Sequence, residues 1–250
     1  TLLPSVARAG CLLYRDAGLG ASGLVRARRQ TPQYDYSFGR QNWFGYALDE
    51  QRAARERVAI VDYSMLGKIS VEGVGAEAFL QWVCTNNMAM ACGRIAYTLL
   101  LNERGGIESD VTVARYADDY FMVMSSIART RRDYLWLAAL IEPEEQVKLR
   151  DETASLGVLG VMGPQSRALM TAVTDLDVTN EAFPFNRFYE CHIGHAKVTA
   201  QRLSYSGELG WEVLVTPDFA EHVLDSLLSA GAPLGVKLLG SEALNALRIE

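Results

Sequence analysis

One order of segments occurs twice in this chain, about ninety residues apart, and it constrains the fold more than any single motif. In the first copy the strand-like Lys68–Val71 precedes an amphipathic helix over Gly75–Cys84. In the second copy Gly157–Met162 precedes a helix over Gln165–Val173. Internal duplication of an α+β unit is the simplest explanation, and it predicts two antiparallel sheets that meet across a shared interface. Ligand sites favour such interfaces.

The strand-to-helix corners of the two copies also match, Val71–Gly75 beside Val161–Pro164. Thr216 and Pro217 supply an N-cap and a first-turn residue for a later helix. The remaining predicted strands are Val58–Val61, Ile95–Asn102, Asp110–Ala114, Tyr120–Met124, Lys197–Ser204 and Glu212–Val215, and the remaining predicted helices are Arg129–Ile141, Pro217–Leu228 and Ser241–Glu250.

Two glycine turns each lead into an apolar strand that carries an acid, within Gly105–Val113 and Gly207–Val215. Glycine permits the positive φ that a tight reversal needs, so we expect hairpins here. We expect Asp110 and Glu212 at the first residues of the following strands, at matching points of the duplicated unit, facing one pocket from opposite sides. The alternative is that each acid is a solvated strand end, the usual environment of an acid.

Two tyrosines accompany these acids. Tyr97 lies across the first hairpin from Asp110, and Tyr205 precedes the second turn. An aromatic face beside a carboxylate suits a flat ring that carries N–H donors. The alternative is ordinary cross-strand packing.

Composition excludes several classes of partner. The 250 residues are 49% hydrophobic, which is enough for a substantial core. The net charge of −6 and the absence of a basic stripe argue against nucleic acid, so a small molecule or a protein is the expected partner. No apolar run reaches transmembrane length. The four scattered cysteines, Cys11, Cys84, Cys92 and Cys191, indicate reduced thiols in an intracellular compartment.

Two other motifs carry no function in this interpretation. Gly18–Gly23 matches a dinucleotide-binding pattern, but no strand-helix-strand unit surrounds it. His192 and His195 are three apart beside Cys191, yet zinc needs three or four convergent ligands, so we expect no metal site. We expect a strand turn at Gly194, between these histidines, and an exposed helical position for His222.

The ends of the sequence suggest a piece of a longer protein. It opens on Thr1 without a methionine, and it stops at Glu250 inside a helical pattern without a cap. Residues 1–30 hold five arginines against one acid, a composition similar to a mitochondrial presequence. They have no place in the predicted fold, and disorder is one expectation for them.

Four strings resemble the folate-binding, aminomethyltransferase-like portion of the sarcosine and dimethylglycine dehydrogenases, a family related to the T-protein of the glycine cleavage system. They follow the family's order from about Tyr46 to the end of the chain, and the second and third look most similar to sarcosine dehydrogenase. The strings are Leu101–Val113 (LNERGGIESDVTV), Asn180–Phe185 (NEAFPF), Leu203–Glu212 (LSYSGELGWE) and Ala243–Glu250 (ALNALRIE).

The resemblance implies a division of labour. An N-terminal FAD domain, absent from this chain, oxidises an N-methyl amine and passes electrons to an acceptor. Tetrahydrofolate captures the released one-carbon unit as methylenetetrahydrofolate in the region present here. The implied fold is α+β, with two antiparallel sheets around a central folate cavity and the C-terminal part missing. The implied location is the mitochondrial matrix in a eukaryote and the cytoplasm in a bacterium.

The same resemblance divides the chain and assigns residues. Residues 31–56, with the aromatic stretch Tyr34–Phe44, are similar to the linker from the FAD domain, and residues 57–250 are the truncated folate domain. Asp110 matches a catalytic acid that assists proton movement near the folate nitrogens or stabilises an iminium. Glu212 matches the acid that holds the pterin's amino group and ring N–H. The implied folate-binding set is Tyr97, Asp110, Met124, Ser126, Tyr205 and Glu212.

Two departures from the family leave alternatives open. The chain has Ser126 where T-proteins often have asparagine, and Leu244 where they have arginine. One alternative is a free-standing aminomethyltransferase, against which the aromatic linker-like stretch argues. The other is a non-catalytic regulatory or scaffold relative, which the two departures keep open.

Overall fold

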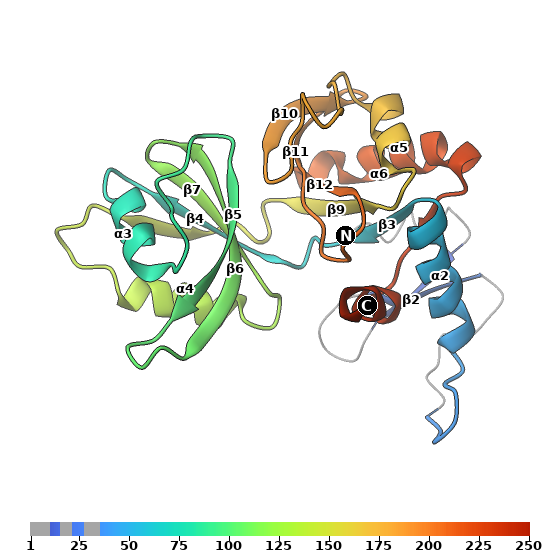
Figure 1. Ribbon diagram of the computed structural model, residues 1–250, viewed down its shortest axis with the longest axis horizontal. Helices are drawn as coiled ribbons and strands as arrows, with labels where there is room; N and C mark the ends of the chain where they lie inside the picture. Colours follow the sequence, from blue (N-terminus) through green and yellow to red (C-terminus); the bar gives the residue numbers. More distant parts are fainter. Residues whose placement is uncertain (1–10, 16–21, 28–35) are drawn as a thin grey trace. The chain divides into compact units, whose positions relative to one another are not determined.

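The computed structural model of the protein describes residues 11–15, 22–27 and 36–250 (Figure 1). The chain divides into two compact units. Unit 1 comprises the chain up to Tyr63 together with Gly157–Phe185 and Glu190–Glu250, and unit 2 comprises Ser64–Leu156 and Asn186–Tyr189. Each unit is described by itself.

Unit 2 is built on a five-stranded antiparallel sheet with strand order β5-β6-β7-β4-β8. Helices α3 and α4 cover one face, as Figure 1 shows, and bury their apolar side chains against it. The elements are β4 (Gly67–Glu72), α3 (Ala76–Val83), β5 (Ile95–Leu101), β6 (Ile107–Ala117), β7 (Tyr120–Ser125), α4 (Thr130–Ala139) and β8 (Lys148–Asp151).

Alternation along the strands decides what each face of this sheet carries. Val111 and Val113 of β6 belong to the core beneath the helices, together with Phe121 and Val123 of β7. Successive side chains of a strand point to opposite faces, so Asp110 lies on the face away from the helices. The burial of the valines therefore fixes where this acid is presented.

Unit 1 contains a six-stranded sheet of order β10-β11-β12-β9-β3-β13. The pairings β3-β9, β9-β12 and β11-β12 are antiparallel, whereas β13 pairs with β3 in parallel, which the prediction of two antiparallel sheets did not include. The elements are α2 (Phe44–Glu56), β3 (Ala59–Asp62), β9 (Gly157–Met162), α5 (Ser166–Val173), β10 (Phe188–Ile193), β11 (Ala196–Gln201), β12 (Gly210–Val215), α6 (Pro217–Gly231), a 3-10 turn η1 (Ala232–Leu234), β13 (Lys237–Leu238) and α7 (Ser241–Ile249).

Helices pack on both faces of this second sheet. Leu169 of α5 and Leu224 of α6 pack with Trp211 in a core on one face. On the other face α2 and α7 form a smaller core with β3 and β9 (Figure 1). A separate hairpin joins β1 (Cys11–Arg15) and β2 (Ser22–Ala27) in antiparallel register. The glycine pattern over 18–23 falls largely outside the described residues.

The structure confirms the predicted α+β fold with a repeated unit. The two strand-to-helix corners coincide closely, since Gly73 and Gly163 both have φ +118°. Strand β4 and helix α3 span the same lengths as β9 and α5, with both pairs ninety residues apart, as 157 − 67 and 166 − 76 show.

The described part of residues 31–56 includes helix α2. Ala47 and Ala54 of α2 are buried against α7, and the buried Glu50 accepts a hydrogen bond from the Gly240 N–H at 2.9 Å. Glu50 thereby satisfies a donor at the start of α7. None of the helices in the described part of the chain combines the length and the hydrophobicity that a membrane span requires.

Candidate functional site

The first group of predicted site residues lies on unit 2, where the β5–β6 hairpin brings Tyr97 to Asp110. Leu99 pairs with Asp110 and Tyr97 pairs with Thr112, so the two site residues are diagonal neighbours on one face. The Tyr97 hydroxyl donates to Asp110 Oδ2 over 2.9 Å. Both side chains are exposed, Tyr97 by 60%. The pair therefore presents a carboxylate of fixed direction to whatever binds this face.

Met124 and Ser126 lie farther along the same sheet. Met124 of β7 pairs with Thr112 of β6, which pairs in turn with Tyr97, so three neighbouring strands contribute one row of side chains. Met124 is buried, whereas Ser126 is exposed after the end of β7. The Ser126 carbonyl accepts the N–H groups of Arg129 and Thr130, which begins α4. The structure thus gives the Ser126 backbone a role in starting a helix.

The residues that precede Asp110 are tied to helix α4. The buried Asp133 of α4 accepts hydrogen bonds from Ser109 Oγ, at 2.8 Å, and from Ser125 Oγ. Arg132 forms an ion pair with Glu108. A hydrogen bond from Asn102, with Arg132 and Arg129 nearby, lowers the pKa of Glu108.

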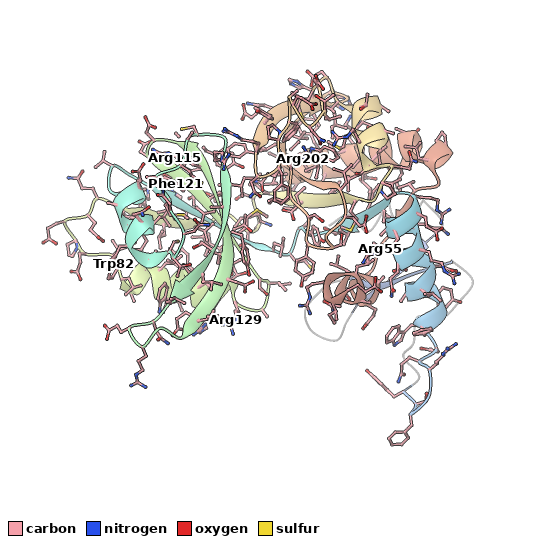
Figure 2. All side chains as sticks on the ribbon, viewed as in Figure 1. Arg55, Trp82, Arg115, Phe121, Arg129 and Arg202 are labelled. Carbon is pink, nitrogen blue, oxygen red and sulfur yellow. The ribbon has the colours of Figure 1, made fainter. Side chains whose placement is uncertain are left out.

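Arg129 and Arg132 also donate to the carbonyl of Glu108, which lies at the start of β6. Figure 2 labels Arg129 near this strand. Side chains of α4 and of the residue before it thus anchor β6 at Glu108 and Ser109. These contacts hold the backbone next to Asp110 in place.

The second group lies on unit 1, where Glu212 occupies β12. It pairs with Gly160 of β9 on one side and with the buried Gln201 of β11 on the other. Glu212 is half-buried, and desolvation raises its pKa to about 7. Ionised carboxylates are poorly solvated in such surroundings. Glu212 is therefore suited to a ligand whose N–H groups stabilise its charged form.

Tyr205 lies in the loop between β11 and β12 and is 49% exposed. The Arg248 guanidinium of α7 stands 5.8 Å from the centre of its ring. In the same loop Glu208 forms an ion pair with Arg55 of α2, and Arg55 also bonds Glu250 at 2.8 Å. Figure 2 places Arg55 on α2. Helices α2 and α7 together therefore hold the loop that carries Tyr205.

The string Asn180–Phe185 is fixed by two arginines. Arg167 and Arg202 each donate to Asn180 Oδ1 over 2.7 Å, and both guanidinium groups lie over the ring of Trp211, at 5.5 and 5.8 Å. Desolvation and the neighbouring Arg167 lower the pKa of Arg202, which is labelled in Figure 2. Trp211 is fully buried on the face under α5 and α6, so these contacts secure the strand that carries Glu212.

The expectation that the two acids occupy matching points is wrong. Strands β4 and β9 correspond, because each precedes one of the two matching helices. Counted outward from them, the strand orders are β4-β7-β6-β5 and β9-β12-β11-β10, so β7 corresponds to β12 and β6 to β11. Glu212, on β12, therefore corresponds to a β7 position, whereas Asp110 lies on β6. Neither acid begins its strand, because β6 starts at Ile107 and β12 at Gly210.

The two glycine turns explain why Asp110 and Glu212 seemed equivalent in the sequence. Gly105 and Gly207 have φ of +76° and +81°, and each precedes its acid by five positions. In topology, however, the counterpart of the Gly105 turn is the β10–β11 turn at Gly194, where φ is +59°. Two turns that need the same residue type thus resemble each other without being equivalent.

The three histidines make local contacts in unit 1. The backbone N–H of His192 donates to Asp175 Oδ1 over 3.2 Å. The turn expected at Gly194 is present, with a φ of +59°. His222 is half-buried and not exposed as predicted, because its ring stacks on His195 with centroids 3.7 Å apart. Among the described residues no three His, Cys, Asp or Glu side chains gather as metal ligands would. Cys84, Cys92 and Cys191 are free thiols.

One residue near Glu212 had no signal in the sequence. Tyr63 directly follows β3, and its ring lies over Gly160, the cross-strand partner of Glu212. Its proximity depends on how β3, β9 and β12 align, and these strands come from distant parts of the chain. The proximity of Tyr63 to Glu212 becomes visible only when the register of these three strands is known.

Comparisons with known proteins agree with this architecture. The profile of the GCVT N-terminal domain family matches residues 15–250. The chain is 37% identical over 220 residues to 4-methylaminobutanoate oxidase (formaldehyde-forming) of Paenarthrobacter nicotinovorans, covering 88% of this chain and 27% of that protein. It is 32% identical to human mitochondrial sarcosine dehydrogenase, covering 96% and 30%. It is 31% identical to the aminomethyltransferase of Chloroherpeton thalassium, covering 81% and 56%.

The chain thus spans between about a quarter and about half of the length of these relatives. A solved structure with the same fold is the glycine cleavage system aminomethyltransferase T from Bartonella henselae. Its TM-score is 0.71 at 23% identity, over 87% of this chain and 58% of that one. A chain of the heterotetrameric sarcosine oxidase from Corynebacterium sp. U-96 gives a TM-score of 0.59 at 18% identity, over 80% and 98%.

Proposed function

Because the chain belongs to the GCVT N-terminal domain family, we propose that it binds tetrahydrofolate and transfers a one-carbon unit to it. In this proposal it is the folate part of a sarcosine or dimethylglycine dehydrogenase-like flavoprotein. An FAD domain elsewhere in that protein oxidises the N-methyl amine and passes electrons to an acceptor. The product here is methylenetetrahydrofolate. The protein works in the mitochondrial matrix of a eukaryote or the cytoplasm of a bacterium.

The observation that carries this proposal is the contrast between two carboxyl groups. Asp110 is exposed and receives a hydrogen bond from Tyr97, whereas Glu212 is half-buried with its pKa raised to about 7. A carboxyl group whose ionisation is disfavoured gains most from a ligand that brings N–H donors. The amino group and ring N–H groups of a pterin are such donors. We assign Glu212 to binding for this reason.

We assign Asp110 to the chemistry. Its carboxylate is held in one direction by Tyr97 and by a strand that α4 anchors. A preorganised carboxylate can accept or return a proton at a folate nitrogen, and it stabilises a cationic iminium as charge develops. The exposed rings of Tyr97 and of Tyr205 can each offer an aromatic face to a flat ligand.

The free-standing aminomethyltransferase is the second candidate. It is favoured by the resemblance to the Bartonella henselae protein, which shares the fold over most of this chain. Both candidates require tetrahydrofolate, and they differ in the donor of the one-carbon unit. Transfer from a carrier-bound aminomethyl group by the purified chain would favour the aminomethyltransferase.

Calorimetric titration of the 250-residue chain with tetrahydrofolate tests the proposal, with Glu212→Ala as the control variant. We expect saturable binding by the parent and none by a folded Glu212→Ala variant. A folded parent that binds no tetrahydrofolate would contradict the proposal and favour a non-catalytic scaffold relative. Binding retained by Glu212→Ala would contradict the role given to Glu212.

A further inference from the structure

Tyr63 places a shielded hydroxyl group beside the Glu212 strand. Its backbone N–H donates to the Val158 carbonyl over 2.8 Å, which continues the alignment of β3 with β9. Within the described part of the chain its hydroxyl oxygen is buried and has no hydrogen-bond partner. An unsatisfied buried hydroxyl lowers the stability of the folded state, so its retention calls for a reason.

The ring of Tyr63 occupies the space that a missing side chain leaves. A Cβ built on Gly160 would lie 2.5 Å from Tyr63 Cε2 and 2.8 Å from Cδ2, so the ring needs a glycine there. Gly160 pairs directly with Glu212 in the sheet. Strands in a sheet lie about 4.8 Å apart, so the tyrosine ring lies close to the Glu212 side chain on the same face.

The charge environment keeps this hydroxyl protonated. Burial raises the pKa of Tyr63 well above its usual value, and the nearby Glu212 and Tyr205 raise it further. The group therefore remains an O–H donor throughout the neutral range. Glu212 and Tyr205 are the residues already assigned to the ring of the ligand, and Tyr63 lies among them.

We propose that Tyr63 is a ligand-binding residue whose hydroxyl hydrogen-bonds the ring that Glu212 holds. This inference rests on the proposed function, because it takes that ring to be the pterin of tetrahydrofolate. The pterin carries a carbonyl oxygen next to its N–H and amino groups. A hydroxyl donor beside a carboxylate matches this row of acceptor and donors, so the ligand supplies the partner that the Tyr63 hydroxyl lacks.

The test is the substitution Tyr63→Phe, which removes one oxygen and keeps the ring over Gly160. We expect the urea midpoint of the ligand-free variant to equal or exceed that of the parent, because an unsatisfied group is removed. We expect its Kd for tetrahydrofolate to rise about tenfold, since one hydrogen bond to the ligand is lost. A residue of purely structural importance would give the opposite pair of results.

Tyr134→Phe is the matched control, because its hydroxyl faces the Leu149 carbonyl at 3.5 Å in unit 2. Its Kd should equal that of the parent. An unchanged Kd in Tyr63→Phe, while Glu212→Ala loses binding, would overturn the assignment of Tyr63 alone. A ligand-free Tyr63→Phe that is less stable than the parent would also overturn it. Absence of tetrahydrofolate binding by the parent would overturn the proposed function, and the assignment of Tyr63 with it.

Discussion

The Tyr97 hydroxyl and Asp110 Oδ2 lie 2.9 Å apart across the β5–β6 hairpin, on side chains that are both exposed. A hydrogen bond in water contributes little to folding, so this contact matters more for the direction of the carboxylate than for stability. The strand beneath it is secured separately by Asp133. The site therefore separates the groups that hold the fold from the group that we assign to the chemistry.

Replacement of Asp110 by asparagine should separate catalysis from folding. Because the side chain is exposed, we expect Asp110→Asn to change the free energy of unfolding by less than about 0.5 kcal/mol. Loss of the proton acceptor should slow methylenetetrahydrofolate formation from tetrahydrofolate and formaldehyde about 100-fold relative to the parent's catalysed rate. Affinity for tetrahydrofolate should stay close to that of the parent. Equal losses of affinity in Asp110→Asn and Glu212→Ala would contradict the separate roles.

Glu212 should make stability depend on pH in a definite direction. Its pKa is about 7 in the folded chain and about 4.3 when unfolded. The unfolded state then loses this proton first as pH rises, so this group favours folding at low pH. Its contribution is lost between about pH 4.3 and 7, at about 1.4 kcal/mol for each pKa unit of difference.

Urea unfolding of Glu212→Gln across this pH range measures the effect. The amide does not ionise, so the variant should match the parent near pH 4 and exceed it in stability at pH 8. Glu103→Gln, at an exposed position of the β5–β6 turn, should follow the parent at every pH. A constant difference between Glu212→Gln and the parent would show that the Glu212 carboxyl is not desolvated.

Asp133 should be important for stability although it lies outside the proposed ligand set. Asp133→Ala leaves the buried hydroxyls of Ser109 and Ser125 without their acceptor, and we expect a loss of about 2–4 kcal/mol in urea unfolding. Asp118→Ala is the control, since the Asp118 side chain is 96% exposed and should cost less than about 0.5 kcal/mol. Similar small losses in both variants would mean that water replaces the carboxylate.

The two corner glycines should not tolerate a side chain. A Cβ on Gly73 would lie 2.0 Å from the Gln146 carbonyl oxygen, and one on Gly163 would lie 2.6 Å from the carbonyl oxygens of Ala54 and Arg57. Backbone cannot yield as a flexible side chain does, so we expect Gly73→Ala and Gly163→Ala each to cost more than about 3 kcal/mol by urea unfolding.

The turn glycines provide the comparison. Gly105 and Gly207 also have positive φ, but a Cβ on either would meet no atom within 4 Å. Alanine there carries only the cost of the left-handed conformation, about 1–2 kcal/mol. Equal losses at corner and turn positions would show that the dihedral angle, and not the close approach of the carbonyl oxygens, requires glycine at the corners.

Local patterns predicted most of the elements. Alternating and continuous apolar runs predicted the bounds of β4, β9 and α5 to within a residue or two, because buried elements require apolar residues at their buried positions. The pattern failed at the sheet edges. Strand β8 (Lys148–Asp151) consists mostly of charged residues, and such an edge strand needs few apolar side chains.

The same distinction holds for the candidate site. Contact between Tyr97 and Asp110 was predictable, because one hairpin sets the register between residues close in sequence. The relation of Tyr63 to Glu212 was not predictable, because it depends on the alignment of β3, β9 and β12, and β3 and β12 are nearly 150 residues apart along the chain. The turn sequences around Gly105 and Gly207 also suggested an equivalence that the strand order does not contain.

The identical φ at Gly73 and Gly163 bears on the history of the molecule. Between these copies the core partners have changed, with Phe79 and Leu80 standing where the second copy has Leu169 and Met170. The two corners thus share a glycine and its backbone angle, as expected of copies of one segment, while the side chains packed behind them differ. Comparison of glycines and their dihedral angles at such corners should therefore find related segments even where the core side chains differ.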